Sequence, residues 1–426
     1  MDTRILKKIE INNQVINNFR NKTEKISNKL CDKTLDASVH ETLKKKRKYL
    51  YRPFVRSFSG HVDGVLCIKR HSKHPSLFFS GGSDGQVKFW IVSKKKCIHS
   101  IQAHESFIRD LAVDFSGLTL LSCSDDFSLK LWHISEIQVK PKACFENNSI
   151  FNSISTHPSS HFFATGGKEI LLWDLNKFEP IQKLVWGLTS VSRIQFNPIE
   201  HNIISSCGSD RSILFCDLRI HKPIEKVLLD MRSNDISWSF FNPWEFTVAN
   251  EDSNLYSFDL RNLKEVSKIY RGHVMPVLSI DQDPTSQLFA SGSCDNTIRL
   301  YKNNVQVSNE IFFTQRMRRI LDLSFSLDGQ YLISASEDGD LRLWRKFEKR
   351  SFLHINPLRN GIKTDDIHSS VEIEFASSPK LVPRAIKNMI YIRNVINRSE
   401  KKRQFKSNTR ILPGYLSFKP KDRKII

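Results

Sequence analysis

The middle of the sequence repeats one short pattern of polar and apolar residues. Each copy runs from an aspartate through alternating apolar residues to an aromatic residue, as in Asp84–Trp90, Asp126–Trp132 and Asp338–Trp344. Four further copies are degenerate, and the one at Gly167–Trp173 keeps the tryptophan but lacks the aspartate. The seven copies end at Trp90, Trp132, Trp173, Cys216, Phe258, Tyr301 and Trp344. A step of 41 to 43 residues between these ends is the length of one four-stranded blade. The repeat therefore predicts an all-β protein with a seven-bladed β-propeller.

The residues within each copy indicate a strand that follows a tight turn. Leu129-Lys130-Leu131-Trp132 alternates in side-chain direction, as a strand does. Gly, Asn and Asp before such strands suit hairpin turns, as in Gly81–Gly85. A blade cannot bury both faces alone, so blades stack around an axis and close into a ring. Because Pro53–Phe58 occupies the place that Cys97–Ile101 fills one repeat later, we expect it to complete the seventh blade.

Charge divides the chain into three parts. Residues 53–347 are the expected propeller, between extensions at 1–52 and 348–426. Residues 1–56 carry 15 Lys and Arg against 6 Asp and Glu, and residues 345–426 carry 20 against 7. The residues between them carry 30 against 32, although the whole chain has a net charge of +20. Basic arms on a nearly neutral body are typical of nucleic-acid binding.

The front extension contains a dense basic run behind a capping-box pattern at Ser38–Glu41. The run consists of Lys44, Lys45, Lys46, Arg47 and Lys48. With the tyrosines beside it, this run could neutralise phosphates and stack on unpaired bases. A nuclear import signal and a solvated helix face are the alternatives, and the sequence leaves all three open.

The rear extension contains a pattern that predicts an amphipathic, basic helix near 383–404. Ile386, Met389 and Ile390 lie on one side at helical spacing, and basic residues surround them. The positive charge continues beyond the apolar stripe at Lys401, Lys402 and Arg403, which are further candidates for RNA contact. We expect a partner-binding helix, with packing on the propeller rim as the alternative.

Composition excludes several classes of protein. No apolar run approaches the roughly 18 residues that span a bilayer, so we expect no membrane association, and the first residues lack a secretory pattern. The eight cysteines show no Cys-x-x-Cys pair, which argues for a reducing compartment and against a zinc site or a disulfide framework. The sequence also lacks a Gly-x-x-x-x-Gly-Lys-Ser/Thr loop. We therefore expect a non-catalytic protein without a cofactor, metal or small-molecule substrate.

A histidine lies at a fixed distance before three of the turn aspartates. His61, His104 and His273 stand 22 or 23 residues before Asp84, Asp126 and Asp295, and in this the chain resembles the WD-repeat family. The resemblance implies a buried hydrogen-bonded tetrad in each of these blades. The implied tetrads are His61, Ser80, Asp84 and Trp90; His104, Ser122, Asp126 and Trp132; and His273, Ser291, Asp295 and Tyr301. A His-Asp-Ser set also suggests a hydrolase triad, but its repetition in phase with the blades favours a structural role.

Two longer segments narrow the resemblance. Leu229–Trp238 and Phe241–Arg261, together with Val185-Trp186-Gly187 and Gln315-Arg316-Met317, resemble the Sof (suppressor of fibrillarin) family of WD-repeat proteins. The resemblance implies a nuclear and nucleolar scaffold of the small-subunit processome in ribosome biogenesis. Its implied partners are other processome proteins, a box C/D small nucleolar ribonucleoprotein and pre-ribosomal RNA, with a role in pre-rRNA (18S) processing and 40S assembly.

The blades without histidine indicate a candidate face for partners. Counting back 22 residues from their turn aspartates leads to loops that would share the histidine face. The candidate residues there are Trp186, Asp230, Arg232, Arg316, Arg318 and Arg319. Exposed Trp and Arg are common interface anchors, whereas Asp230 and Arg232 could equally pair with neighbouring blades.

A substrate receptor of a cullin–RING ubiquitin ligase is the alternative function, since some relatives of the family are linked to that role. Such receptors carry Trp-Asp-x-Arg at the end of a blade strand. Asp217-Leu218-Arg219 and Asp259-Leu260-Arg261 keep the Asp-x-Arg part, but Cys216 and Phe258 replace the tryptophan.

Overall fold

The computed structural model describes residues 53–346, except 95, 135–140, 178, 185–189 and 221–222. It also describes residues 389–392, 395 and 398–399, which are helical and fall within the helix predicted near 383–404. The remainder of that helix and the front extension lie outside the described residues.

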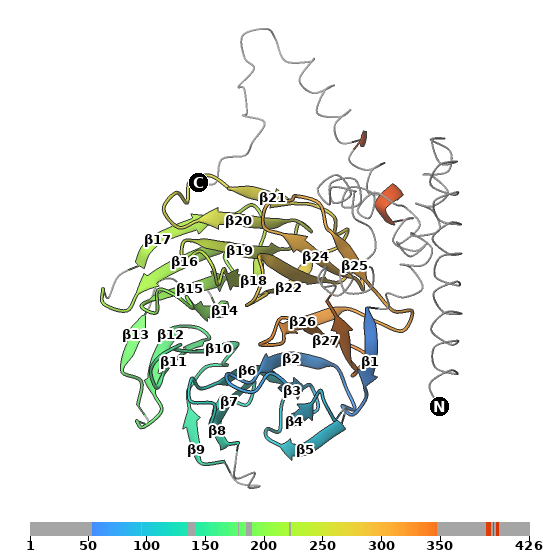
Figure 1. Cartoon of the computed structure of the whole chain (residues 1–426). Coiled ribbons are helices and arrows are strands. Elements are labelled where there is room, and N and C mark those ends of the chain that lie inside the picture. Colours follow the sequence, from blue (N-terminus) through green and yellow to red (C-terminus); the bar gives the residue numbers. More distant parts are fainter. Residues whose placement is uncertain are drawn as a thin grey trace, which may run out of the picture. The chain divides into compact units, whose positions relative to one another are not determined.

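The strands form seven four-stranded antiparallel sheets arranged around an axis (Figure 1). The innermost strands, each beside the next around the ring, are β2 (Val65–Arg70), β6 (Ile108–Val113), β10 (Ser153–Thr156), β14 (Val191–Phe196), β18 (Ser233–Trp238), β22 (Val277–Gln282) and β26 (Ile320–Phe325). The second strands are β3 (Leu77–Gly82), β7 (Thr119–Ser124), β11 (Phe162–Gly166), β15 (Ile203–Gly208), β19 (Glu245–Asn250), β23 (Leu288–Ser293) and β27 (Tyr331–Ser336).

The remaining strands complete the blades towards the outside. The third strands are β4 (Gln86–Ile91), β8 (Ser128–His133), β12 (Ile170–Asp174), β16 (Ser212–Asp217), β20 (Leu255–Asp259), β24 (Ile298–Lys302) and β28 (Leu341–Arg345). The outermost strands are β5 (Lys96–Gln102), β9 (Ala143–Glu146), β13 (Gln182–Leu184), β17 (Pro223–Leu228), β21 (Lys268–Tyr270), β25 (Glu310–Phe312) and β1 (Phe54–Phe58). The prediction of an all-β, seven-bladed propeller is confirmed.

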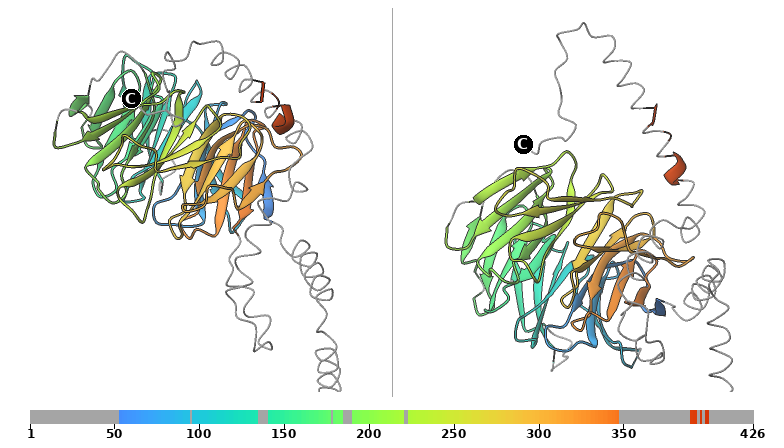
Figure 2. Two further views of the ribbon diagram at one scale, coloured as in Figure 1. Left: turned by 90° about the horizontal axis from the view of Figure 1, so that it is seen from above. Right: turned by 45° about the horizontal axis from the view of Figure 1, so that its top comes forward.

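The ring closes through a strand from the beginning of the propeller. β1 pairs antiparallel with β28, with Phe58 opposite Leu341 and Phe54 opposite Trp344. The first strand, in blue, therefore lies beside the last strands, in orange and brown (Figure 2). The predicted completion of the seventh blade by Pro53–Phe58 is confirmed.

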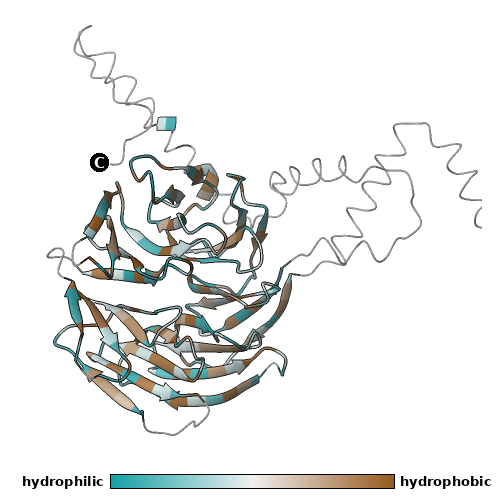
Figure 3. Cartoon of the chain, turned by 60° about the vertical axis from the view of Figure 1, so that its left-hand side comes forward, coloured by the Kyte–Doolittle hydropathy of each residue, from teal (hydrophilic) through white to brown (hydrophobic). Residues whose placement is uncertain are grey.

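The hydrophobic core lies between neighbouring blades. Most of the apolar colour in Figure 3 follows the strands. Trp132 of blade two packs in one cluster with Phe79 and Phe89 of blade one, and Trp173 of blade three lies 5.6 Å, ring centre to ring centre, from Phe145 of blade two. Burial of large aromatic side chains against the preceding blade stabilises the ring as a whole, because apolar area is removed from water at every interface.

The turn between the second and third strands has a recurring backbone conformation. The residue directly after the turn aspartate has a positive φ in six blades. These residues are Gly85, Phe127, Arg211, Ser253, Asn296 and Gly339. Glycine and asparagine adopt this left-handed conformation readily, whereas it is uncommon for other residues.

Candidate functional site: the loop face and axis of the propeller

In blades one and two, the four expected side chains form a continuous hydrogen-bonded chain. His61 Nδ1 lies 3.1 Å from Asp84 Oδ2, and His61 Nε2 lies 2.7 Å from Ser80 Oγ, which also accepts from Trp90 Nε1 at 2.8 Å. In blade two, both ring nitrogens of His104 lie 2.8 Å from their partners, Asp126 Oδ2 and Ser122 Oγ. These hydrogen bonds connect the loop that enters each blade to the turn and to the third strand.

Burial determines what these side chains can do chemically. Desolvation lowers the pKa of His61, His104 and His273, although the neighbouring aspartates oppose that shift. Ser80, Ser122 and Ser291 have no exposed surface. A nucleophilic serine must reach a substrate, so these sets are suited to holding the blades together and not to catalysis.

Blade six departs from the tetrad that the resemblance implied. His273 contacts Asp295 Oδ2 at 2.9 Å and Ser291 Oγ at 2.6 Å, but the hydroxyl of Tyr301 is buried and has no hydrogen-bond partner among the described residues. An indole N–H projects from the side of its ring, whereas a phenol hydroxyl lies at the tip. The hydroxyl at the tip of Tyr301 lies close to Gly272 and does not bond to Ser291. The prediction that Tyr301 belongs to the network was wrong.

Blade seven holds its turn aspartate with an arginine that sequence reasoning missed. Arg342, four residues after Asp338 on the same hairpin, forms an ion pair with Asp338 and donates to Ser336 Oγ at 2.6 Å. The guanidinium side chain is almost completely buried. The signal was the basic residue four positions after the aspartate, which also occurs as Lys130 in blade two, where its ammonium donates to Ala103 O.

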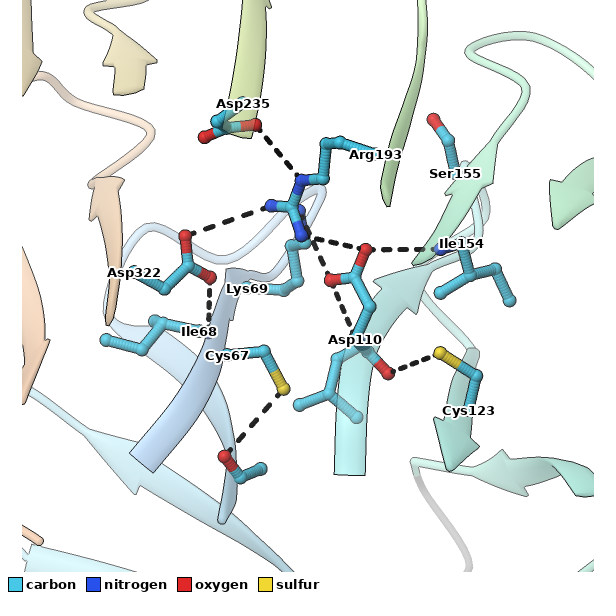
Figure 4. A network of polar contacts seen from close by, with 12 residues as sticks. Cys67, Ile68, Lys69, Asp110, Cys123, Ile154, Ser155, Arg193, Asp235 and Asp322 are labelled. Atoms are coloured by element: carbon cyan, nitrogen blue, oxygen red, sulfur yellow. Dashed lines mark hydrogen bonds and ion pairs between the residues drawn. The ribbon is translucent and has the colours of Figure 1, made fainter. Parts of the chain in front are cut away.

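A second group of polar residues, which the sequence analysis did not predict, meets at the axis of the ring (Figure 4). Arg193 on β14 lies 3.0 Å from Asp110 on β6, 3.1 Å from Asp235 on β18 and 3.8 Å from Asp322 on β26. Each aspartate also accepts a backbone N–H from another blade. The donors are Ile154 to Asp110, Ile280 to Asp235 and Ile68 to Asp322, at 2.8 to 3.1 Å.

The axial cluster joins four blades electrostatically. Burial raises the pKa of Asp322 to about 6, and burial also raises the pKa of Asp235. Burial alone would lower the pKa of Arg193, but the three carboxylates outweigh it and raise that pKa. Each carboxylate accepts a backbone N–H and also lies within ion-pair distance of the guanidinium, so the buried charges are compensated. We interpret the cluster as a structural element that holds the four blades together at the axis of the propeller.

The candidate partner face is only partly described. Asp230 lies between β17 and β18 and is exposed, and Arg232 in the same loop is half-buried near Cys207 of blade four. Arg316, Arg318 and Arg319 lie between β25 and β26 and are all exposed. Both loops connect an outer strand to the next inner strand, as the loops with His61 and His104 do, so they lie on the same face. Trp186 lies outside the described residues.

An acidic residue that is distant in sequence lies near one of the three arginines. Arg319 Nε lies 3.7 Å from Glu337 Oε2, and the backbone N–H of Glu337 donates to Arg319 O. Both side chains are well exposed, so such a pair contributes little to stability and could be exchanged for a partner's charge. The RNA-contact candidates Lys44, Lys45, Lys46, Arg47, Lys48, Lys401, Lys402 and Arg403 lie outside the described residues.

The two Asp-x-Arg segments form local pairs. Arg219 Nε lies 3.2 Å from Asp217 Oδ1, and Arg261 Nε lies 3.2 Å from Asp259 Oδ1. The guanidinium of Arg261 also stacks over the ring of Trp244 at 5.5 Å. Both arginine side chains are about two-thirds exposed and remain accessible to a partner.

No helix in the described part of the chain is long and apolar enough to cross a membrane. Within the same residues, no group of three or more His, Cys, Asp or Glu side chains could hold a metal ion.

Seven four-stranded blades, two of which carry a complete His-Ser-Trp-Asp network, define a WD-repeat β-propeller. The sequence profile of the family "WD domain, G-beta repeat" matches residues 52–90, 95–133, 264–302 and 313–345. Protein SOF1 of Saccharomyces cerevisiae is 34% identical over 84% of this chain and 80% of the relative. DDB1- and CUL4-associated factor 13 of Xenopus tropicalis is 32% identical over 87% and 85%, and that of Homo sapiens is 31% identical over 71% and 68%. The chain belongs to the Sof family of WD-repeat proteins.

Proposed function

We propose that the chain is a non-catalytic scaffold of ribosome biogenesis that acts in the small-subunit processome. It would work in the nucleus and nucleolus, through contacts with other processome proteins, a box C/D small nucleolar ribonucleoprotein and pre-ribosomal RNA. The observation that carries this proposal is the match to Protein SOF1. It covers 84% of the chain, which is more than the propeller, so the relationship includes part of a basic extension.

The structure of the propeller supports a binding role. The His-Ser-Asp sets that could suggest catalysis are buried and repeat in three blades. The loop between β25 and β26, which we name the arginine loop, exposes Arg316, Arg318 and Arg319 before blade seven. A rigid, nearly neutral ring with a charged loop and basic extensions is suited to holding protein and RNA partners together.

Depletion of the protein in cells, followed by measurement of both ribosomal subunits, tests this function. We expect small-subunit RNA and its late precursors to fall while large-subunit RNA is maintained. Equal loss of both RNAs, or no loss of either, would contradict the proposal.

The alternative is a substrate receptor of a cullin–RING ubiquitin ligase. The observation that favours it is the name DDB1- and CUL4-associated factor 13 carried by several relatives. The exposed Arg219 and Arg261 are the residues such a role would use. Changing both to Glu should then abolish copurification of ligase subunits, whereas the scaffold role predicts unchanged small-subunit RNA in that variant.

A further inference from the structure

Blade two carries a bulky residue in a backbone conformation that disfavours it. Phe127 follows the turn aspartate with φ of 62°, where blades one and seven have Gly85 and Gly339. A large side chain at positive φ is a conformational outlier, and such strain persists where the residue has another use.

The side chain of Phe127 gains little from the fold. Its exposed fraction is 48%, so about half of the ring faces solvent. Phe107 is equally exposed, and Ile150 is 40% exposed. Glycine and asparagine are the residues preferred at a turn position with positive φ. Neither the backbone conformation nor burial therefore accounts for an aromatic residue at this position.

The three loops and turns that carry these residues are adjacent on the loop face of blade two. The N–H of Asp125, two residues before Phe127, donates to Phe107 O at 3.2 Å. The N–H of Asn147 donates to Phe127 O at 3.1 Å and begins the loop that carries Ile150. We name Phe107, Phe127 and Ile150 the blade-two patch.

Acidic residues surround the blade-two patch. The adjoining loops and turns carry seven acidic residues against one arginine and one exposed lysine, Arg109 and Lys168. The acidic residues are Asp63, Asp84, Glu105, Asp125, Asp126, Glu146 and Glu169. Arg109 is already bound by Asp125, with both bonds at 2.7 Å. The nearby Lys88 and Lys130 donate to loop carbonyl oxygens. The patch is therefore apolar at its centre and acidic at its rim.

We propose that the blade-two patch is a docking surface for a segment of a separate protein in which apolar residues are flanked by Lys or Arg. Aromatic residues at the centre of a contact and complementary charge at its rim are features of specific interfaces. This surface is distinct from the arginine loop before blade seven, which would favour partners of the opposite charge. The inference holds whether or not the chain acts in ribosome biogenesis.

The first test measures thermal unfolding of the full chain. Because glycine relieves the strain at positive φ, Phe127→Gly should raise Tm by roughly 1–3 °C. Arg211→Gly is the matched control, since Arg211 has φ of 68° at the same position of blade four, and it should give a similar rise. A fall in Tm for Phe127→Gly alone would show that Phe127 serves the fold, and would overturn the proposal.

The second test selects binding peptides from a displayed library of random 16-residue sequences against the full chain. Enriched peptides should combine apolar residues with Lys or Arg, and should bind Phe127→Gly and Phe107→Ser at least tenfold more weakly. Arg211→Gly should bind them normally. Because the selection uses no ribosomal particle, its result is independent of the proposed cellular function.

Several outcomes of the selection would overturn the proposal. These are acidic peptides, peptides that bind the two phenylalanine variants normally, or a selection that enriches no peptide sensitive to Phe127→Gly. Peptides resembling residues 383–404 would assign the patch to this chain's own rear extension, which also contradicts a separate partner.

Discussion

Blades two and seven solve the same structural problem in different ways. Both have a tryptophan that donates to a serine of the second strand, Trp132 to Ser122 at 3.0 Å and Trp344 to Ser334 at 2.9 Å. In blade two, the turn aspartate is held by a histidine from the entering loop. In blade seven, it is held by Arg342 from its own hairpin.

The difference between blades two and seven shows that the four-residue network has two separate structural roles. The tryptophan–serine contact locks the second strand to the third, and it does not depend on the histidine. The histidine additionally ties the entering loop to the turn. Blade seven has no such histidine, and its entering loop presents Arg316, Arg318 and Arg319 to solvent. Loss of one structural residue thus coincides with a surface available for binding.

The largest expected effect is the loss of either tryptophan. Trp132→Ala and Trp344→Ala should each lower the free energy of unfolding by about 3–5 kcal/mol, because each leaves a large cavity between blades. Chemical denaturation of the two variants measures this. A cost for Trp344→Ala that is smaller by more than about 2 kcal/mol would show that the tryptophan contact depends on the histidine after all.

Removal of Arg342 should have the next largest effect. Arg342→Met leaves Asp338 without its buried guanidinium partner. We expect a loss of about 2–3 kcal/mol, less than for a fully buried pair because the Asp338 side chain is 16% exposed. Adding Asp338→Asn should restore part of the stability, since the uncompensated charge is then removed. Equal stability of the single variant and the parent would refute the role of Arg342.

The two blades should also differ in their response to acid. Burial lowers the pKa of His104 below its ordinary value of 6.5, so between these two values the unfolded chain binds a proton that the folded chain does not. Stability should therefore fall as the pH drops through about 6.5. Asp322, with its pKa raised to about 6, contributes in the opposite direction.

Variants isolate the contribution of the histidine. His104→Gln should flatten the decrease in unfolding free energy between pH 7 and 5. The double variant Arg342→Met with Asp338→Asn should leave the slope unchanged, because it removes both charges of the blade-seven pair and leaves no carboxylate whose pKa would rise. The measurement is denaturation at a series of pH values. An unchanged slope in His104→Gln would show that this histidine does not control the acid response.

Charge reversal in the entering loop of blade seven should affect binding and not folding. Changing Arg316, Arg318 and Arg319 together to Glu should alter unfolding free energy by less than about 1 kcal/mol, because exposed charges contribute little. The variant should nevertheless fail to enter preribosomal particles on density gradients. Lys142, Lys177 and Lys183, exposed elsewhere on the propeller, form a matched triple control when changed to Glu. Normal incorporation of the arginine variant would exclude this loop as a partner site.

The smallest expected effect concerns blade six. Tyr301→Phe removes a buried hydroxyl that has no hydrogen-bond partner among the described residues. The free energy of unfolding should therefore change by less than about 0.5 kcal/mol or rise slightly. A loss of 1 kcal/mol or more in denaturation would show that the hydroxyl is bonded, as it would be in a complete tetrad.

Much of the propeller follows from the sequence because its signals are local and repeat. The spacing of the aspartates and tryptophans predicts the blades, and the spacing of His61 and His104 places the side chains that meet Ser80 and Ser122. The axial cluster was beyond such reasoning. Asp110, Arg193 and Asp322 come from different blades, and their meeting depends on closure of the ring. In the sequence, the only sign of the cluster was a charged residue within each of these apolar inner strands.

Substitutions within the repeat were equally difficult to predict. The position of the Tyr301 hydroxyl depends on the shape of the phenol ring and its orientation in the blade, and the residue type alone does not show this orientation. In blade four, where Cys216 replaces the tryptophan, Trp238 of blade five donates to Ser205 across the interface at 2.8 Å. The first segment that resembles the Sof family, Leu229–Trp238, marks this region as unusual, but it does not show which serine the indole reaches.

The central claim is that a nearly neutral ring binds proteins while basic extensions bind precursor RNA of the small subunit. Crosslinking the protein to RNA in cells, with sequencing of the RNA and mapping of the crosslinked peptides, tests it most directly. We predict small-subunit precursor RNA attached mainly within residues 1–52 and 348–426. Crosslinks confined to the propeller, or RNA unrelated to the small subunit, would contradict the account.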